Sequence, residues 1–389
     1  MKILFVSSAY KGASRMGGPA VSIAATAEAL VRAGHAVTVA TTNANLDRNL
    51  DVPLNQPLDM NGVTVWYFER QEPLKRWLPF VPYLSQSSGF AYAPAMKEAL
   101  PRFIADADVV DTQTPFVYPT IAAARIARRL GKPLFYHQRG NLIPSRMQRR
   151  QLKKKAYIAL FEGRIMKRAA GLIALTEGER EAFAEFAPGT PCAVVPNGVE
   201  VPPPDPAAPA RVAARWGIPI DAPVILYLAR LEPWKGYEEL LQSFARVGSN
   251  AYLVMAGVDQ SDARARWQLP RVVFTGPLSG QEKADVLHRA DLFALPSHGE
   301  GLSMAMLEAL AYGTAVLLSP ECHFAEAASA GAGVIVPRGI EAWTAAMDEL
   351  LRDPAQLRAM GERGRALAER EYSWDVIARR LAEVYARAR

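Results

Sequence analysis

The chain alternates short runs rich in valine and isoleucine with stretches of helical periodicity, and the same rhythm occupies both of its halves. In the first half these apolar runs lie at 3–7, 36–42, 63–68, 108–114, 133–138 and 171–176. In the second half they lie at 223–229, 251–257, 272–276, 291–297, 314–319 and 333–337. Short buried strands that alternate with helices indicate parallel strands joined by crossover helices. The pattern therefore predicts an α/β protein with two doubly wound parallel sheets.

One segment, VEVPPPDPAAPA at 199–210, interrupts this alternation with five prolines. Such a stretch cannot form a regular helix or a central strand, so we expect a stiff, extended linker there. It separates an N-terminal domain at 1–198 from a C-terminal domain at 211–372. The remaining stretch, 373–389, contains a helix with an apolar stripe.

Composition narrows the class of protein further. A chain of 389 residues that is 50% apolar and 22% charged excludes wholesale disorder. The two cysteines, Cys192 and Cys322, are too few for a disulfide framework and too far apart in sequence for a zinc cluster, so we expect a reducing, cytoplasmic compartment. No apolar run approaches the roughly 20 residues of a membrane-spanning helix, and the apolar N-terminus is too short for a signal peptide. A net charge of +6 favours an anionic partner.

The standard phosphate-binding motifs do not fit the chain. Gly12 and Gly17 have the spacing of a P-loop, but Gly18 and Pro19 stand where lysine and serine or threonine are required. The segment 331–333 precedes its strand and lacks the third glycine of a dinucleotide fingerprint. The Gly17-Gly18 pair before the first helix remains, where backbone amides can approach an anion. A plain tight turn is the alternative.

The second half carries the residues with the clearest chemistry. Arg230 and Lys235 follow the strand at 223–229, at the edge where open parallel sheets bind ligands. Two such cations suit a diphosphate, although surface charges at a helix start are the alternative. Glu300 lies on a glycine-rich loop, and Glu308 lies on the apolar helix that follows. A carboxylate on a buried helix needs a partner, either sugar hydroxyls or a salt bridge.

Taken together, these residues resemble the retaining, nucleotide-sugar-dependent glycosyltransferases of family 4, which have the GT-B fold. The resemblance covers essentially the whole chain, and its most specific part is the Glu-x7-Glu segment from Glu300 to Glu308. The Arg230/Lys235 loop and the segment 196–199, PNGV, support it. It implies two facing Rossmann-like domains with a cleft between them, a hinge at the prolines and a last helix that crosses back to the N-terminal domain.

The resemblance also implies roles for the matching positions. Arg230 and Lys235 would hold the donor diphosphate and stabilise its charge as it leaves. Glu300 would contact the donor sugar, and Glu308 would contact the ribose. Further donor contacts are implied for the amides of Gly301, Leu302 and Ser303, for Gly17 and Gly18 from the other domain, and for Leu278, which would lie against the nucleobase.

Two departures from the family concern the N-terminal domain. The family usually has a histidine just before a small residue at the end of a strand, but here Arg139 precedes Gly140. His137 stands two residues earlier, on the same strand face by the period of two, so either side chain could reach the sugar. A core histidine is the other interpretation of His137. The segment 111–114, DTQT, replaces histidines that many relatives carry, which weakens any inference about the acceptor.

We expect no metal and no cofactor beyond the nucleoside-diphosphate sugar, which is the donor substrate. Asp106-Ala107-Asp108 has the spelling of a metal-binding Asp-x-Asp motif, but it precedes its strand, at the end of the sheet away from ligands. No cluster elsewhere has zinc-ligand spacing. Arg230 and Lys235 would supply the charge stabilisation that a metal provides in other enzymes.

The stretch 146–168 contains nine lysines and arginines and a single glutamate. Its expected helix places Tyr157, Phe161 and Ile165 on one stripe. A solvated basic face is one interpretation, and contact with an anionic membrane surface is the sharper one. Nucleic acid is not expected, since no recognition motif accompanies the charge.

These observations predict a hexosyltransferase that moves sugar from a nucleoside-diphosphate sugar to a glycan or lipid-linked acceptor. The expected setting is bacterial surface polysaccharide biosynthesis (exopolysaccharide, capsule or lipopolysaccharide), at the inner face of the cytoplasmic membrane. A nucleotide-sugar 2-epimerase of similar architecture and a non-enzymatic polyanion-binding protein are the alternatives. The sequence does not choose among UDP, GDP and ADP, and it leaves open the sugar, the acceptor and the oligomeric state.

Overall fold

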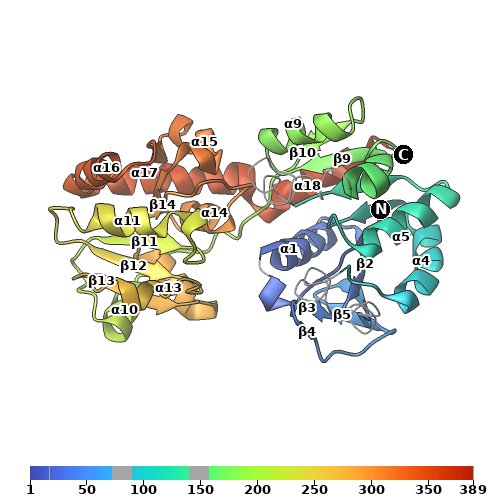
Figure 1. Ribbon diagram of the computed structural model, residues 1–389, viewed down its shortest axis with the longest axis horizontal. Coiled ribbons are helices and arrows are strands. Elements are labelled where there is room, and N and C mark those ends of the chain that lie inside the picture. Colours follow the sequence, from blue (N-terminus) through green and yellow to red (C-terminus); the bar gives the residue numbers. More distant parts are fainter. Residues whose placement is uncertain (17, 72–89, 140–156, 389) are drawn as a thin grey trace. The chain divides into compact units, whose positions relative to one another are not determined.

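The computed structural model describes residues 1–16, 18–71, 90–139 and 157–388, which form two compact units (Figure 1). The first unit comprises Met1–Gly198 and Trp374–Arg389, and the second comprises Val199–Ser373. The chain therefore passes between the units twice. In the first unit Gly198 lies against Trp374, since a Cβ at Gly198 would come within 2.4 Å of the indole ring. In the second unit the Val199 amide donates to the Tyr372 carbonyl at 2.7 Å.

The first unit is built on an eight-stranded sheet of order β10-β9-β8-β7-β1-β2-β6-β5, in which only β5 runs antiparallel to its neighbour. Its strands are β1 (Lys2–Val6), β2 (Ala36–Thr42), β5 (Pro57–Met60), β6 (Val63–Phe68), β7 (Val109–Thr112), β8 (Leu134–His137), β9 (Gly171–Ala174) and β10 (Cys192–Val194). A separate two-stranded hairpin consists of β3 (Ala44–Asn45) and β4 (Arg48–Asn49).

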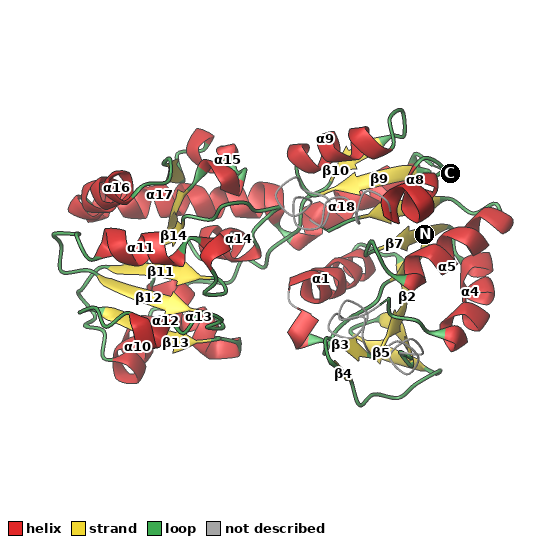
Figure 2. Cartoon of the chain, in the orientation of Figure 1, coloured by secondary structure: helices red, strands yellow, loops and turns green. Residues whose placement is uncertain are grey.

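Helices from both chain segments of the first unit, Met1–Gly198 and Trp374–Arg389, surround this sheet (Figure 2). They are η1 (Ser14–Met16), α1 (Gly18–Arg32), α4 (Pro94–Asp106), α5 (Tyr118–Arg129), the π-helical η2 (Ile158–Glu162), α8 (Gly163–Met166), α9 (Glu177–Phe186) and α18 (Trp374–Ala386). The last of these packs against α1, where Arg32 and Asp375 form an ion pair at 3.1 Å. Tyr385 of α18 also stacks edge-on against Phe135 of β8. The last helix is thus an integral part of the first unit.

The second unit has a six-stranded, fully parallel sheet of order β13-β12-β11-β14-β15-β16. Its strands are β11 (Val224–Leu228), β12 (Tyr252–Ala256), β13 (Val272–Gly276), β14 (Leu292–Leu295), β15 (Ala315–Leu318) and β16 (Gly333–Ile335). Its helices are α10 (Ala208–Trp216), η3 (Pro233–Lys235), α11 (Tyr237–Phe244), α12 (Ala263–Arg266), α13 (Gly280–Arg289), α14 (Met304–Ala311), η4 (Pro320–Cys322), α15 (Ala325–Ser329), α16 (Ile340–Arg352), α17 (Pro354–Leu367) and the π-helical η5 (Ala368–Tyr372).

The two sheets, one fully parallel and one parallel except for β5, confirm the predicted fold class, because each of the expected apolar runs contains a strand. The burial of the central strands agrees with this fold. Strands β11, β14 and β15 are almost entirely buried, as expected for strands covered on both faces. One boundary differs from expectation. Helix α10 begins at Ala208, inside the predicted linker 199–210, because Pro209 stands in the first helical turn, where proline is tolerated.

Each sheet contains a point where the order of its strands reverses. In the second unit the chain moves from β11 to β12 and β13, and then returns to β14 on the other side of β11. In the first unit the corresponding neighbours are β1 and β7. Open α/β sheets bind ligands beyond the carboxyl ends of the strands at such points. A ligand-binding site is therefore expected at the loops that follow β11 and β14.

No helix within the described ranges is both long and apolar enough to cross a membrane. Cys192 and Cys322 are both free thiols, one in each unit.

Candidate active site

Two loops meet at the β11/β14 reversal and are held together by hydrogen bonds and by a close backbone approach. The His298 amide donates to the Trp234 carbonyl at 2.9 Å, and the Trp234 indole donates to the Gly299 carbonyl at 3.3 Å. Gly236 has a left-handed φ of +69°, and a Cβ there would lie 2.0 Å from the Pro296 carbonyl oxygen. Only glycine permits this conformation together with so close an approach. The two loops thus form one rigid platform.

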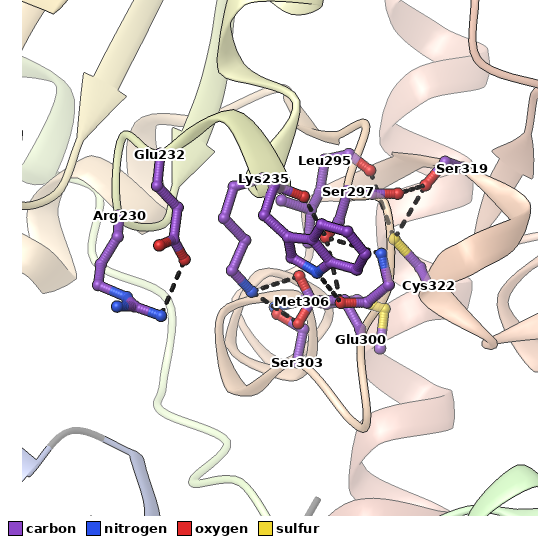
Figure 3. Close-up of polar contacts among 12 residues, drawn as sticks. Arg230, Glu232, Lys235, Leu295, Ser297, Glu300, Ser303, Met306, Ser319 and Cys322 are labelled. Atoms are coloured by element: carbon purple, nitrogen blue, oxygen red, sulfur yellow. Dashed lines mark hydrogen bonds and ion pairs between the residues drawn. The ribbon is translucent and has the colours of Figure 1, made fainter. Parts of the chain in front are cut away.

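Lys235 and Glu300 form a buried ion pair across this platform (Figure 3). The Nζ atom of Lys235 lies 2.6 and 2.7 Å from the two carboxylate oxygens of Glu300. The side chains are only 15% and 5% exposed, so Lys235 is not the surface charge that was the alternative interpretation. Removing two charges from water is costly, and a pair placed at a ligand-binding edge is a candidate functional group.

Arg230 extends from the same loop as Lys235 in Figure 3. Its side chain is 53% exposed, and its Nη2 lies 2.8 Å from a carboxylate oxygen of Glu232. A guanidinium has five N–H donors. One ion pair leaves most of them available for an anionic ligand.

The start of α14 lies beside the ion pair. Ser303 caps this helix, and its Oγ accepts a hydrogen bond from the Met306 amide at 3.4 Å. Gly301 and Leu302 precede the cap. The N-terminus of a helix presents unpaired amides and a partial positive charge, which suits a phosphate.

The other residues predicted to bind the donor are Glu308, Leu278, Gly17 and Gly18. Glu308 on α14 pairs with Lys283 of α13, whose Nζ lies 2.7 Å from the carboxylate, so the salt bridge that was one alternative for Glu308 is present. Leu278 is half-buried and packs against the core of the second unit. Gly18 is the first residue of α1, and Gly17 lies outside the described residues. The ribose and nucleobase contacts remain predictions.

In the first unit, Arg139 is buried at the carboxyl edge of the sheet. Its Nε and Nη2 donate to Gln113 Oε1, and its Nη1 donates to Asn197 Oδ1 at 2.9 Å and to Ser22 Oγ at 3.3 Å. Burial lowers the pKa of Arg139 to about 10, so the guanidinium is still charged at neutral pH. These hydrogen bonds fix the plane of a buried cation beyond the carboxyl end of β8.

His137 is the last residue of β8, and its ring is also buried. Burial, with a smaller contribution from Arg139, lowers the pKa of His137 to about 4, so the imidazole is neutral at pH 7. Its Nδ1 lies 3.8 Å from Asp111 Oδ2, which is longer than a hydrogen bond. The same carboxylate oxygen accepts a hydrogen bond from the Tyr385 hydroxyl on α18.

The expectation that His137 and Arg139 share one strand face is wrong. The strand ends at His137, and Arg139 has a left-handed φ of +51°, so the period of two no longer applies there. The sequence predicts no role for Gln113, Asn197, Ser22 or Tyr385 in this cluster. Gln113 and Asn197 belong to segments that the sequence analysis singled out, whereas Tyr385 is 274 residues from Asp111 and had no signal.

The Asp-x-Asp segment joins a helix to a strand. Asp106 ends α4 and is paired with Lys2 at 2.6 Å, while Asp108 accepts a hydrogen bond from the Lys2 amide at 2.9 Å. Within the part of the chain that the structure describes, no three His, Cys, Asp or Glu side chains lie close enough to hold a metal ion. Metal independence remains a prediction.

Two family models match the chain. The model described as "Glycosyl transferase 4-like domain" matches residues 17–198, and the model described as "Glycosyl transferases group 1" matches residues 211–367. The fold, with one largely parallel α/β sheet in each of two units, is that of the GT-B glycosyltransferases. The chain belongs to the family of glycosyltransferases that these two models define.

Individual relatives support this assignment. The chain is 31% identical to a D-inositol 3-phosphate glycosyltransferase of Kineococcus radiotolerans over 58% of its length and 59% of that protein. It is 30% identical to a GDP-mannose-dependent monoacylated alpha-(1-6)-phosphatidylinositol monomannoside mannosyltransferase of Corynebacterium glutamicum, over 49% of its length and 55% of that protein. The matched regions thus span less than two thirds of these relatives.

Among solved structures, Anabaena HepE in complex with UDP and glucose superposes with a TM-score of 0.74. The two sequences are 18% identical, and the superposition covers 100% of both chains. At this identity the likeness shows the fold alone.

Proposed function

We propose that the protein is a retaining hexosyltransferase that uses a nucleoside-diphosphate sugar as donor. The observation that carries the proposal is the buried Lys235–Glu300 pair beside the exposed guanidinium of Arg230, at the carboxyl edge of the second sheet. The nucleotide stays open, since one relative is named for GDP-mannose and one structural neighbour contains UDP.

In this proposal the cations stabilise the diphosphate as it leaves the sugar. The Lys235 ammonium has three N–H donors, of which two are directed to the oxygens of Glu300. The third is available for a diphosphate oxygen, and Glu300 holds the ammonium in place for it. Arg230 can bind two oxygens of the same group. Charge stabilisation of this kind requires no metal ion.

The acceptor in this proposal is a glycan or a lipid-linked sugar of a bacterial surface polysaccharide. One relative is named as acting on an acylated phosphatidylinositol mannoside, which is a membrane lipid. The cytoplasmic face of the membrane is the setting that fits such an acceptor. The basic stretch 146–168 would contact that surface. Its residues 146–156 lie outside the described residues, and 157–168 belong to η2, α8 and their flanks.

A thermal-shift screen against UDP, GDP, ADP and their hexose conjugates tests the donor assignment. A ligand at 100 times its dissociation constant should raise the free energy of unfolding by about 2.7 kcal/mol. The conjugate that stabilises the protein is then incubated with acceptors in excess EDTA, and the anomeric configuration of the product is determined. Retention without a metal supports the proposal.

Three outcomes would overturn parts of it. The absence of any nucleotide-dependent shift would remove the donor site. Loss of turnover in EDTA, restored by a divalent cation, would remove metal independence. Formation of a 2-epimer without an acceptor would replace transfer with epimerisation.

A further inference from the structure

A pocket of about 350 Å³ lies in the first unit between α5 and the segment formed by η2 and α8. Its floor includes Leu134, at the start of β8, and Ala170, which directly precedes β9. The pocket therefore opens at the amino ends of these strands. Arg139 lies at the opposite, carboxyl edge of the same sheet, so the pocket is separate from the candidate active site.

The lining of the pocket is strongly basic. It includes five cationic side chains, those of Arg125, Arg128, Lys132, Arg164 and Arg168. None of the described lining residues is acidic, and the four arginines are exposed and form no ion pair with any residue of the chain in the described structure. Cations gathered without counter-charges raise the local concentration of anions.

The rest of the lining is apolar. Ile121 and Ile165 line the pocket from its two sides, together with Phe161, whose side chain is 45% exposed. A free inorganic anion would make no favourable contact with this apolar surface. An anion attached to an apolar group would contact both the cations and the apolar side chains.

We propose that this pocket binds the headgroup phosphate of an anionic phospholipid at a bilayer surface. The arginines bind the phosphate, and Phe161 enters the interfacial layer beside it. The inference deepens the proposed function, because it names the lipid partner and the residues that hold it. It does not depend on turnover and is tested without a donor or an acceptor.

The experiment is co-sedimentation of the full chain with vesicles of phosphatidylcholine, with and without about 30 mol% phosphatidylglycerol as the anionic lipid. Binding is expected only to the anionic vesicles and should weaken as salt rises. The variant Arg128→Gln/Arg168→Gln removes two pocket cations and should lower the partition coefficient about 30-fold, by the usual contribution of each basic residue near a charged surface. The matched control is Arg129→Gln/Lys167→Gln. It removes two exposed cations adjacent in sequence that do not line the pocket, and it should change binding less than 3-fold.

Several outcomes are decisive. Equal losses in the two double variants would show general electrostatic attraction and overturn the pocket assignment. Absence of binding to both kinds of vesicle would overturn it too. If inorganic phosphate raises the Tm of the wild type but not of Arg128→Gln/Arg168→Gln, while vesicles do not bind, the pocket takes a soluble anion instead. None of these readouts involves the donor site, so failure here leaves the donor assignment intact.

Discussion

Substitution of Arg230 should reduce catalysis with little loss of stability. Its side chain is half exposed and its ion pair with Glu232 is open to solvent, so Arg230→Ala should leave Tm essentially unchanged. If the guanidinium stabilises a departing diphosphate, kcat/KM should fall by about 100- to 1000-fold. Steady-state kinetics and thermal denaturation check this. Arg215→Ala, which removes an exposed arginine paired with Glu282 in the same unit, is the control. Wild-type kinetics in Arg230→Ala would contradict the diphosphate assignment.

Lys235 differs because its partner is buried. Lys235→Ala leaves the Glu300 carboxylate without a counter-charge, which should lower the free energy of unfolding by about 3 kcal/mol in addition to abolishing turnover. Adding Glu300→Gln removes the stranded charge. The double variant should therefore recover most of the stability in a denaturant titration while turnover stays lost. Recovery of both together would mean that the pair serves only the fold.

Glu162 gives a prediction about pH. It is buried at the end of η2, where it accepts hydrogen bonds from the Phe116 amide and the Tyr136 hydroxyl, and burial raises its pKa to about 7. Between its ordinary pKa of 4.5 and about 7 the folded state holds more protons than the unfolded state, so this group lowers stability as pH rises through that window. Glu162→Gln mimics the protonated form and does not titrate.

Thermal denaturation from pH 5 to pH 8 checks this expectation. The Tm of Glu162→Gln relative to wild type should rise across the range. His137, whose pKa of about 4 gives the opposite slope as pH rises from 4 to 6.5, is present in both proteins and cancels in the comparison. Glu181→Gln on α9, at an exposed position, is the control for loss of a carboxylate. A difference that is constant with pH would contradict the raised pKa.

At the level of elements, the contact between the β11 and β14 loops depends on Gly236. Gly217 has the same φ of +69°, but a Cβ there would have nothing within 4 Å. Gly217→Ala should therefore cost only the left-handed strain of about 1 kcal/mol. Gly236→Ala adds a clash with the Pro296 carbonyl and should cost several kcal/mol more, with a loss of turnover because Lys235 and Glu300 separate. Urea titrations and kinetics of the two variants compare strain alone with strain plus clash. Equal costs would show that the loops are not held together in this way.

The elements that sequence reasoning located correctly are those with a local signal. Buried parallel strands are continuous apolar runs, so β11 and β14 could be found, and with them the loops that carry Arg230 and Glu300. Strand β5 was missed because it is an edge strand whose residues alternate between exposed and half-buried without a strong apolar run. The β3–β4 hairpin is too short to give a pattern.

Contacts between distant residues could not be predicted in the same way. The sequence predicts separate roles for Lys235 and Glu300, since nothing in their 65-residue separation shows that they touch. Arg139 required a positive φ at a non-glycine residue, which no local pattern indicates. Its acceptors come from three other parts of the chain, so the cluster exists only once the sheet has formed.

For the whole molecule, removal of α18 should destabilise the first unit and leave the second unit folded. Trp374, Ile377, Leu381 and Tyr385 are buried within the first unit. At about 1.5–3 kcal/mol each, their burial is comparable to the stability of a typical domain. A chain ending at Ser373 should therefore lose amide protection throughout the first unit, while the second unit keeps its protection and its nucleotide-dependent thermal shift. Hydrogen exchange measures the amide protection of both units, and thermal denaturation with and without nucleotide measures the shift.

A milder variant provides the comparison for this truncation. Tyr385→Phe removes only the hydroxyl that donates to the buried Asp111 and should cost about 1–3 kcal/mol without unfolding the unit. Unchanged exchange in the first unit of the truncated chain would show that α18 is dispensable.

The discontinuity of the first unit also has a consequence for biosynthesis. All strands of its sheet have been translated once Val194 emerges from the ribosome, yet α18 follows only after the residues of the second unit, Val199–Ser373. At 5–20 residues per second this delay is on the order of 10–35 s. Throughout that interval the nascent chain exposes the apolar surface that α18 will cover. Transiently exposed apolar surface makes an incompletely folded chain prone to aggregation, so the first unit is most exposed to misassembly while the second unit is being synthesised.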